Sequence, residues 1–299
     1  MSDPCSRGIP PLFTRLVDDA ALFPPARLPL PEALAAHRTH DRAWYSTLVG
    51  PFLCSDANLP DLCTALGDSP VPLPPDGAAG VWDLPVGLII TGGAGAIGPA
   101  VTWAARADRV QIAAVEVLVR DEPPLARGVA RIALAVDHAG VADDVPVFVE
   151  IPRTGDWESA LDAVAEAGYN AKLRTGGVVA EAFPSEREVA GFVLACLDRE
   201  VPFKCTAGLH RAVRHTSADG FEQLGFLNLL LATRAGLDGC RAGDLADLLT
   251  ERDTAAVVEQ VRALDDAAAA SCRRWCRSFG SCSVSEPLDD LVRLGFLQD

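Results

Sequence analysis

Ala171-Lys172-Leu173 and Val201-Pro202-Phe203-Lys204-Cys205-Thr206 are two short, mainly apolar runs that flank a single helical segment. That segment begins at Ser185-Glu186-Arg187-Glu188, a capping box in which the serine side chain accepts a hydrogen bond from a helix amide and the glutamate reaches back. A strand, a helix and a second strand in this order predict two parallel strands joined by a right-handed crossover.

The same order repeats along the chain before this unit. Apolar runs at 44–54, 86–90, 111–119 and 145–151 are each followed by a helical segment. The run Val86–Ile90 is apolar throughout apart from one glycine, which is typical of a strand buried on both faces. Six strand-then-helix units predict an α/β protein, a single β/α (TIM-type) barrel.

The rest of the chain fits this barrel less well. An eight-stranded barrel needs two strands after His210, and only Trp275–Ser283 is a candidate. We therefore expect an irregular seventh unit and extra C-terminal helices. The predicted organisation is one domain over residues 1–299, with an N-terminal extension at 1–45 that contains a helix and a helical insertion at 211–270.

Charge and composition limit the partners. The formal net charge is −15, whereas nucleic acids and anionic membranes require a basic surface. No apolar run approaches the roughly 20 residues of a membrane span, and the first residues lack a basic segment followed by an apolar one. Nine cysteines, spread through the chain, suit reduced thiols. We expect a cytoplasmic protein that binds a small molecule and does not bind nucleic acid or membrane. The sequence is compatible with a homo-oligomer.

Lysine is rare in this sequence, which suggests a special role for the residues that remain. Lys172 and Lys204 are the only lysines, against 24 arginines. Arginine keeps its proton at neutral pH, whereas a lysine that is desolvated or near another cation can lose it. The composition therefore points to amine chemistry at these two positions.

Four successive predicted strands carry an ionisable residue near the end: Glu116, Glu150, Lys172 and Lys204. A charge in an apolar strand is costly unless it has a partner, and the carboxyl ends of barrel strands meet at one mouth. Four such residues in succession indicate a site.

Two motifs around the lysines resemble those of deoxyribose-phosphate aldolases. Lys172-Leu173-Arg174-Thr175-Gly176 is similar to the family's Lys-x-x-Thr-Gly, and Lys204-Cys205-Thr206-Ala207-Gly208-Leu209 is similar to its Lys-x-Ser-x-Gly-Ile. The similarity covers roughly residues 86–210. It implies a class I aldolase-like lyase without a cofactor, in which Lys172 forms a Schiff base with a small carbonyl substrate and Lys204 lowers the pKa of Lys172. Glu116 takes the place of the family's catalytic aspartate.

Other residues are candidates for substrate binding. Arg174 is suited to grip a carboxylate, and His210 follows the second motif. Gly280-Ser281-Cys282-Ser283 loosely resembles the family's phosphate-binding turn, about 70 residues from the lysine motif. The predicted substrate-binding set comprises Glu150, Arg174, Thr175, Thr206, His210 and Ser281.

Two alternatives keep the barrel. In one, Glu116 and Glu150 hold a divalent metal for an enolising isomerase or lyase, with Lys172 or Lys204 as base. In the other, the protein is a non-catalytic binding module whose four strand charges are core ion pairs. Asp18 and Asp19 are interpreted as a helix cap or turn. The glycine-rich run 91–98 is either a dinucleotide-binding turn or a tight strand-to-helix turn.

Overall fold

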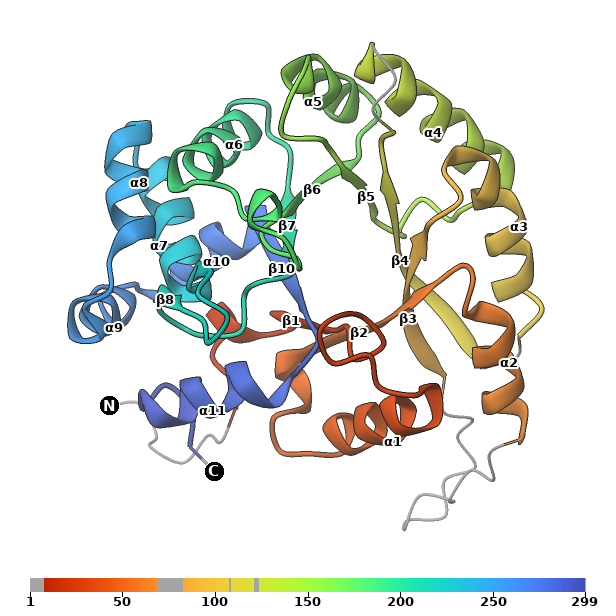
Figure 1. Cartoon of the computed structure of the whole chain (residues 1–299), viewed down its shortest axis with the longest axis horizontal. Coiled ribbons are helices and arrows are strands. Elements are labelled where there is room, and N and C mark those ends of the chain that lie inside the picture. The colour runs from red at the N-terminus through yellow and green to blue at the C-terminus, as the bar shows by residue number, and fades with distance from the viewer. Residues whose placement is uncertain (1–7, 69–82, 108, 121–123, 299) are drawn as a thin grey trace.

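Eight parallel strands close into a barrel in the computed structural model, which describes residues 8–68, 83–107, 109–120 and 124–298 (Figure 1). Each strand is hydrogen-bonded to a parallel neighbour on either side. The predicted TIM-type fold is confirmed. In their order around the barrel, the strands are β1 (Val17–Asp19), β2 (Val49–Ser55), β3 (Leu84–Ile90), β4 (Val110–Leu118), β5 (Val147–Glu150), β6 (Asn170–Arg174), β7 (Phe203–Thr206) and β10 (Cys276–Ser281).

Helices surround the barrel and alternate with its strands (Figure 1). Helix α6 begins with the predicted capping box, in which Ser185 accepts a hydrogen bond from the Glu188 amide. The helices are α1 (Leu30–Asp41), α2 (Leu59–Asp68), α3 (Ala94–Ala104), α4 (Leu125–Ala139), α5 (Trp157–Glu166), α6 (Glu186–Asp198), α7 (Phe226–Leu237), α8 (Ala242–Thr250), α9 (Thr254–Arg262), α10 (Asp266–Trp275) and α11 (Ser285–Arg293), with short 3-10 turns η1 (Pro11–Phe13), η2 (Ser46–Leu48) and η3 (Ala180–Ala182).

The strand missing from the sequence prediction lies at the beginning of the chain. Strand β1 pairs in parallel with β10 on one side and β2 on the other, so it closes the barrel. The predicted N-terminal extension over residues 1–45 is therefore wrong for Val17–Asp19, because these residues form a strand of the barrel. Residues 1–7 lie outside the described residues. The strand escaped prediction because two of its three residues, Asp18 and Asp19, are acidic.

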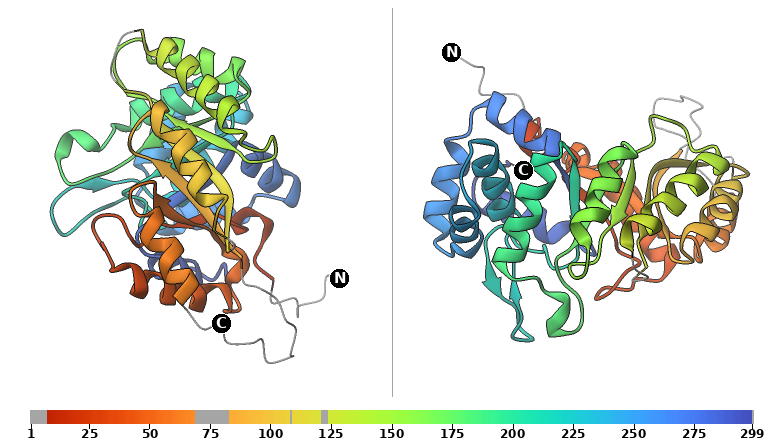
Figure 2. Two further views of the ribbon diagram at one scale, coloured as in Figure 1. Left: turned by 90° about the vertical axis from the view of Figure 1, so that its right-hand side faces the viewer. Right: turned by 90° about the horizontal axis from the view of Figure 1, so that it is seen from above.

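The segment between β7 and β10 is the irregular part of the barrel. It contains a two-stranded hairpin, β8 (His215–Thr216) and β9 (Glu222–Gln223), before helices α7 to α10. The expected insertion at 211–270 is thus not wholly helical, and its last helix continues to Trp275. Figure 2 shows the hairpin and η3 extending from the same side of the barrel.

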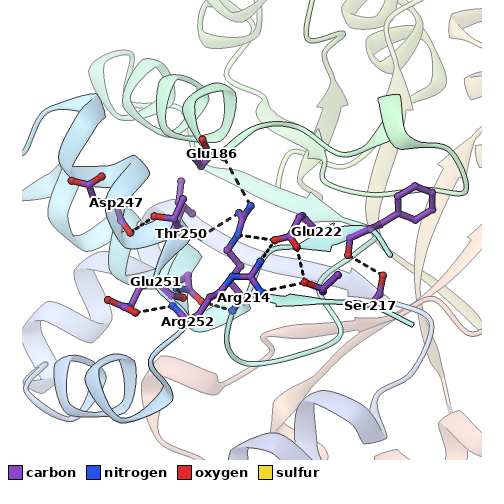
Figure 3. A network of polar contacts seen from close by, with 12 residues as sticks. Glu186, Arg214, Ser217, Glu222, Asp247, Thr250, Glu251 and Arg252 are labelled. Carbon is purple, nitrogen blue, oxygen red and sulfur yellow. Dashed lines mark hydrogen bonds and ion pairs between the residues drawn. The ribbon is translucent and has the colours of Figure 1, made fainter. Parts of the chain in front are cut away.

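Ion pairs connect the hairpin to the neighbouring helices (Figure 3). Glu222 on β9 accepts contacts from Arg214, at 3.4 Å, and from Arg252 between α8 and α9. Arg214 also lies 4.0 Å from Glu186 at the start of α6. The hairpin is therefore held beside the start of α6 and the α8–α9 connection.

The main apolar core joins strand residues such as Val117 and Val149 with helix residues such as Val129 and Leu161 in one buried cluster. The barrel interior is different, because it holds buried charged side chains on β1, β4, β5, β6 and β7. A barrel lumen is usually filled by bulky apolar residues. The charges in this lumen define the candidate site.

No helix among the described residues has the length and apolar character needed to cross a bilayer.

Candidate functional site

The strand charges predicted from the sequence meet inside the barrel. Strand pairing places Glu150 beside Lys172, and Lys172 beside Lys204, on three adjacent strands. Glu116 on β4 reaches both lysines. All four side chains are buried, with Glu116 fully inaccessible to solvent. The register thus aligns Glu150, Lys172 and Lys204, whereas Glu116 pairs with Phe148 on β5 and meets the lysines through the direction of its side chain.

Lys172 lies between two carboxylates. Its Nζ is 2.7 Å from Oε2 of Glu116 and 3.0 Å from Oε2 of Glu150. The second oxygen of Glu150 accepts a hydrogen bond from Nε of Arg174 at 2.9 Å. The Arg174 side chain is about half exposed, at 51%. Glu150 therefore links the buried amine to a guanidinium that solvent and ligands can reach.

Lys204 lies deeper and has its own pair of carboxylates. Its Nζ is 2.5 Å from Oε1 of Glu116 and also donates to Oδ2 of Asp18 on β1. The hydroxyl of Ser278 on β10 donates to the same Asp18 oxygen at 2.7 Å. Glu116 consequently bridges the two amines, with one carboxylate oxygen directed at each.

These contacts change the proton affinities of the buried groups. Burial acts to raise the pKa of Glu116, but the two neighbouring lysines outweigh it and hold that pKa at about 2. Burial acts to lower the pKa of Lys204, but Asp18 and Glu116 raise it well above its ordinary value. At neutral pH, Glu116 is a carboxylate and Lys204 an ammonium group.

The pKa values of the other two carboxylates, Asp18 and Glu150, are shifted in opposite directions. Burial raises the pKa of Asp18, although Lys204 and Ser278 act against the rise. Burial also acts to raise the pKa of Glu150, but Lys172 and Arg174 lower it. One of the two cations that keep Glu150 ionised, Arg174, is at the solvent boundary.

A cavity of about 550 Å³ opens over this network at the carboxyl ends of the strands. Glu116, Glu150, Lys172 and Arg174 line it, and Lys204 does not. Its walls come from the loops that follow the strands, including the β1 loop at Phe23, Arg120 after β4 and the hairpin at Gln223. Of the two lysines, Lys172 is therefore the one that a ligand in this cavity can reach.

The Thr-Gly ends of the lysine motifs fix the loops beneath the cavity wall. Thr175 is buried and donates its hydroxyl proton to the carbonyl oxygen of Ala207 at 2.5 Å, and also lies 3.2 Å from that of Thr206. A Cβ atom on Gly176 would lie 2.9 Å from the Cα of Gly208, which has a φ of +75°. The two motifs thus pack backbone against backbone, where a side chain does not fit.

The remaining predicted substrate-binding residues are divided between the cavity and its surroundings. Thr206 and His210 line the cavity, and His210 Nδ1 is 2.9 Å from the carboxylate of Glu286. Thr175 and Ser281 do not line it. The Ser281 hydroxyl donates to the carbonyl oxygen of Ser283 at 2.8 Å, which stabilises the turn after β10.

The glycine-rich run after β3 is a tight turn into α3. Asp56, after β2, accepts hydrogen bonds from the amides of Thr91 and Gly92 at 3.1 and 3.2 Å. Gly93 has a φ of +73°, and a Cβ there would meet the Arg120 guanidinium at 3.0 Å. A carboxylate of the chain thus occupies amides that would otherwise be available to an anion.

Over the described ranges, no group of three histidine, cysteine, aspartate or glutamate side chains is placed to hold a metal ion. Glu116 and Glu150, the pair predicted as metal ligands in one alternative, both contact the Lys172 amine. Their negative charges are therefore already compensated by cations of the chain.

Asp18 and Arg120 are the main site residues that the sequence interpretation missed. The interpretation of Asp18 as a cap or turn is wrong, because it is a buried partner of Lys204. Its signal is the one used for the other strands, an ionisable residue beside an apolar run, here Leu16-Val17. Arg120 follows a strand in the same way and points to the rim of the cavity.

The sequence matches no protein-family model, and comparison with curated proteins finds no significant relative. The function must therefore be argued from the site itself.

Proposed function

We propose that this protein is a class I aldolase-like lyase in which Lys172 forms an imine with a small carbonyl substrate. The observation that carries the proposal is the position of Lys172, a buried amine on the wall of a cavity with two carboxylates within 3.0 Å. A lysine attacks a carbonyl carbon as the neutral amine, so its proton must first pass to an acceptor, and the adjacent carboxylates are placed to take that proton. The likeness of the two lysine motifs to those of deoxyribose-phosphate aldolases supports the same chemistry.

The reaction proceeds in balanced steps. The neutral amine of Lys172 adds to the carbonyl carbon, and loss of water gives the imine. In a β-hydroxy carbonyl substrate, the bond between the α and β carbons then breaks. Its electron pair moves toward the imine nitrogen to give an enamine, while the β-hydroxyl proton passes to a base and an aldehyde leaves. Protonation of the enamine carbon and hydrolysis of the imine release the second product and restore the lysine.

Glu150 is a better candidate than Glu116 for the group that accepts and returns the proton. Glu116 is fully buried and, with a pKa of about 2, is a poor proton acceptor near neutral pH. Both carboxylates line the cavity, but Glu150 is paired with the half-exposed Arg174, whereas Glu116 contacts the two buried lysines. This arrangement revises the role implied for Glu116 by the family resemblance: in the proposal it holds the two amines in place.

Lys204 supplies a fixed positive charge. Asp18 and Glu116 raise its pKa, and it does not line the cavity. A permanent ammonium group behind Glu116 keeps that carboxylate ionised while Lys172 changes its charge during the reaction. Arg120 and Arg174 at the rim favour a substrate with an anionic group.

Proton exchange tests this proposal without knowledge of the natural aldehyde. An enamine-forming enzyme exchanges the α-hydrogens of its carbonyl donor with solvent, which nuclear magnetic resonance detects in D₂O with acetaldehyde, pyruvate or dihydroxyacetone. We expect exchange by the wild-type protein with at least one donor, undiminished by EDTA, and none by Lys172→Met. Absence of exchange above the Lys172→Met level with all three donors would overturn the proposal.

A further inference from the structure

A second cavity lies at the opposite end of the barrel. Its volume is about 470 Å³, and most of its lining residues precede a strand or lie in the first half of one. Thr14 and Arg15 lead into β1, Pro146 leads into β5, and Arg277 is the second residue of β10. In TIM barrels, catalytic sites occupy the carboxyl ends of the strands, so this cavity is separate from the candidate active site.

Three arginines give this cavity an excess of positive charge. Arg15, Arg273 and Arg277 line it, and Asp144 is the only carboxylate at its mouth among the described lining residues. Further in, Asp18 and Lys204 contact each other, so their charges compensate. The formal net charge of the whole protein is −15, so the positive charge of this cavity is opposite in sign to the charge of the chain.

The arginine charges are not compensated by the chain. Among the described residues, Arg273 donates only to backbone carbonyls, those of Cys276, Thr14 and Arg15, and its buried Nε has no hydrogen-bond partner. The side chains of Arg15 and Arg277 form no ion pair with a described carboxylate and are exposed at the mouth. The cavity therefore presents two unpaired guanidinium groups beside a third that the backbone holds rigidly.

We propose that this cavity binds a small multivalent oxyanion, a phosphorylated compound or a polycarboxylate. Guanidinium groups recognise both kinds of anion through paired, charge-assisted hydrogen bonds. Arg15 and Arg277 each lie two residues before the paired residues Val17 and Phe279 of neighbouring strands, so the two exposed guanidinium groups can contact one anion together, while Arg273 adds positive potential. The inference is independent of the lyase proposal, since no residue of its cationic mouth lines the other cavity.

The inner end of this cavity lies behind the active-site network. Asp18 and Lys204 line it, Lys204 contacts Glu116, and Glu116 lines the cavity at the other end. The Lys204–Asp18 pair is thus part of the partition between the two cavities. An anion bound here therefore lies next to the charges that hold Glu116 in place.

Isothermal titration calorimetry with pyrophosphate and with citrate tests this site on the full-length protein. We expect saturable binding of one anion per chain, weakened about tenfold or more by Arg277→Glu and by Arg15→Gln. Arg187→Glu, which changes an exposed arginine on α6, is the control for charge alone and should leave binding intact. Arg174→Gln removes a cation of the active-site cavity and should also leave it intact.

Each outcome is decisive for the site. Tighter binding of pyrophosphate would identify a phosphorylated ligand, and tighter binding of citrate would identify a polycarboxylate. Absence of saturable binding of either anion would overturn the proposal, as would binding lost in Arg174→Gln but kept in Arg277→Glu. Circular dichroism of the Arg15 and Arg277 variants separates a loss of binding from a loss of folding.

Discussion

Oε2 of Glu116 lies 2.7 Å from Nζ of Lys172, while its other oxygen contacts Lys204 at 2.5 Å. One fully buried carboxylate thus holds both lysines of the chain. The two amines are nevertheless not equivalent. Lys172 lines the active-site cavity, whereas Lys204 is enclosed on the far side of Glu116. This difference allows catalytic and structural roles to be separated by experiment.

Replacing Lys204 should destabilise the protein more than replacing Lys172. Lys204→Met leaves Asp18 without a cation, and breaking a buried ion pair from one side costs about 3–5 kcal/mol. Lys172→Met leaves Glu116 with Lys204 and Glu150 with Arg174, so we expect a smaller loss. Urea unfolding of the two variants measures the difference. Equal losses of unfolding free energy in the two variants would contradict this prediction.

The stability of the protein should fall in acid through the protonation of Glu116. In the folded protein the two lysines hold the pKa of this group at about 2, below its ordinary value of 4.5. A lowered pKa stabilises the folded state above the unfolded value, and this contribution, about 3 kcal/mol, is lost as the pH falls from about 4.5 toward 2. We expect Glu116→Gln to be less stable at pH 7 and to lose less stability across this range. Urea unfolding at several pH values measures both slopes, and parallel curves would contradict the assignment.

Arg174 should control the acid side of the activity profile. Lys172 and Arg174 lower the pKa of Glu150 against the effect of burial, so Arg174→Gln should raise it. If ionised Glu150 accepts the proton, the acid limb of the kcat profile should move to higher pH, and KM for an anionic substrate should rise. Arg199→Gln removes an ion pair with Asp162 on the outer helices and serves as control. An unshifted acid limb would remove Glu150 from the proposed role.

Contact between the two motif loops should make Gly176 intolerant of a side chain. The added Cβ of Gly176→Ala would lie 2.9 Å from Gly208 backbone atoms, which overpacks the junction at a cost of about 1–3 kcal/mol. Gly191→Ala is the matched control, because a Cβ there meets nothing within 4 Å and it lies within α6. The control should be neutral or more stable by about 0.5–1 kcal/mol. Thermal unfolding of both variants measures the contrast, and an unperturbed Gly176→Ala would disprove the close packing.

Much of the barrel could be predicted from the sequence because strands β2 to β6 each lie in a largely apolar run that a helix follows. Strand β1 could not, since it has three residues and two of them are acidic. The β8–β9 hairpin has strands of two residues each and carries no apolar alternation. It is held by long-range contacts of Arg214 and Arg252, which a local sequence pattern does not reveal.

The site shows a similar division. Glu116, Glu150, Lys172 and Lys204 could be placed together because they lie on successive parallel strands, which are neighbours in a barrel. The sequence could not show that Glu116 lies between the amines, or that Lys172 and not Lys204 faces the cavity, because both depend on side-chain direction. Thr175 is in a substrate-binding motif by resemblance, but its hydroxyl is used to join two loops.

Borohydride trapping tests the central claim most directly. The wild-type protein would be incubated with each donor that shows α-hydrogen exchange, reduced with sodium borohydride, digested and mapped by mass spectrometry. We expect a secondary-amine adduct on Lys172, with none on Lys204, and no adduct in Lys172→Met. An adduct on Lys204 alone, or exchange without any adduct on Lys172, would contradict it.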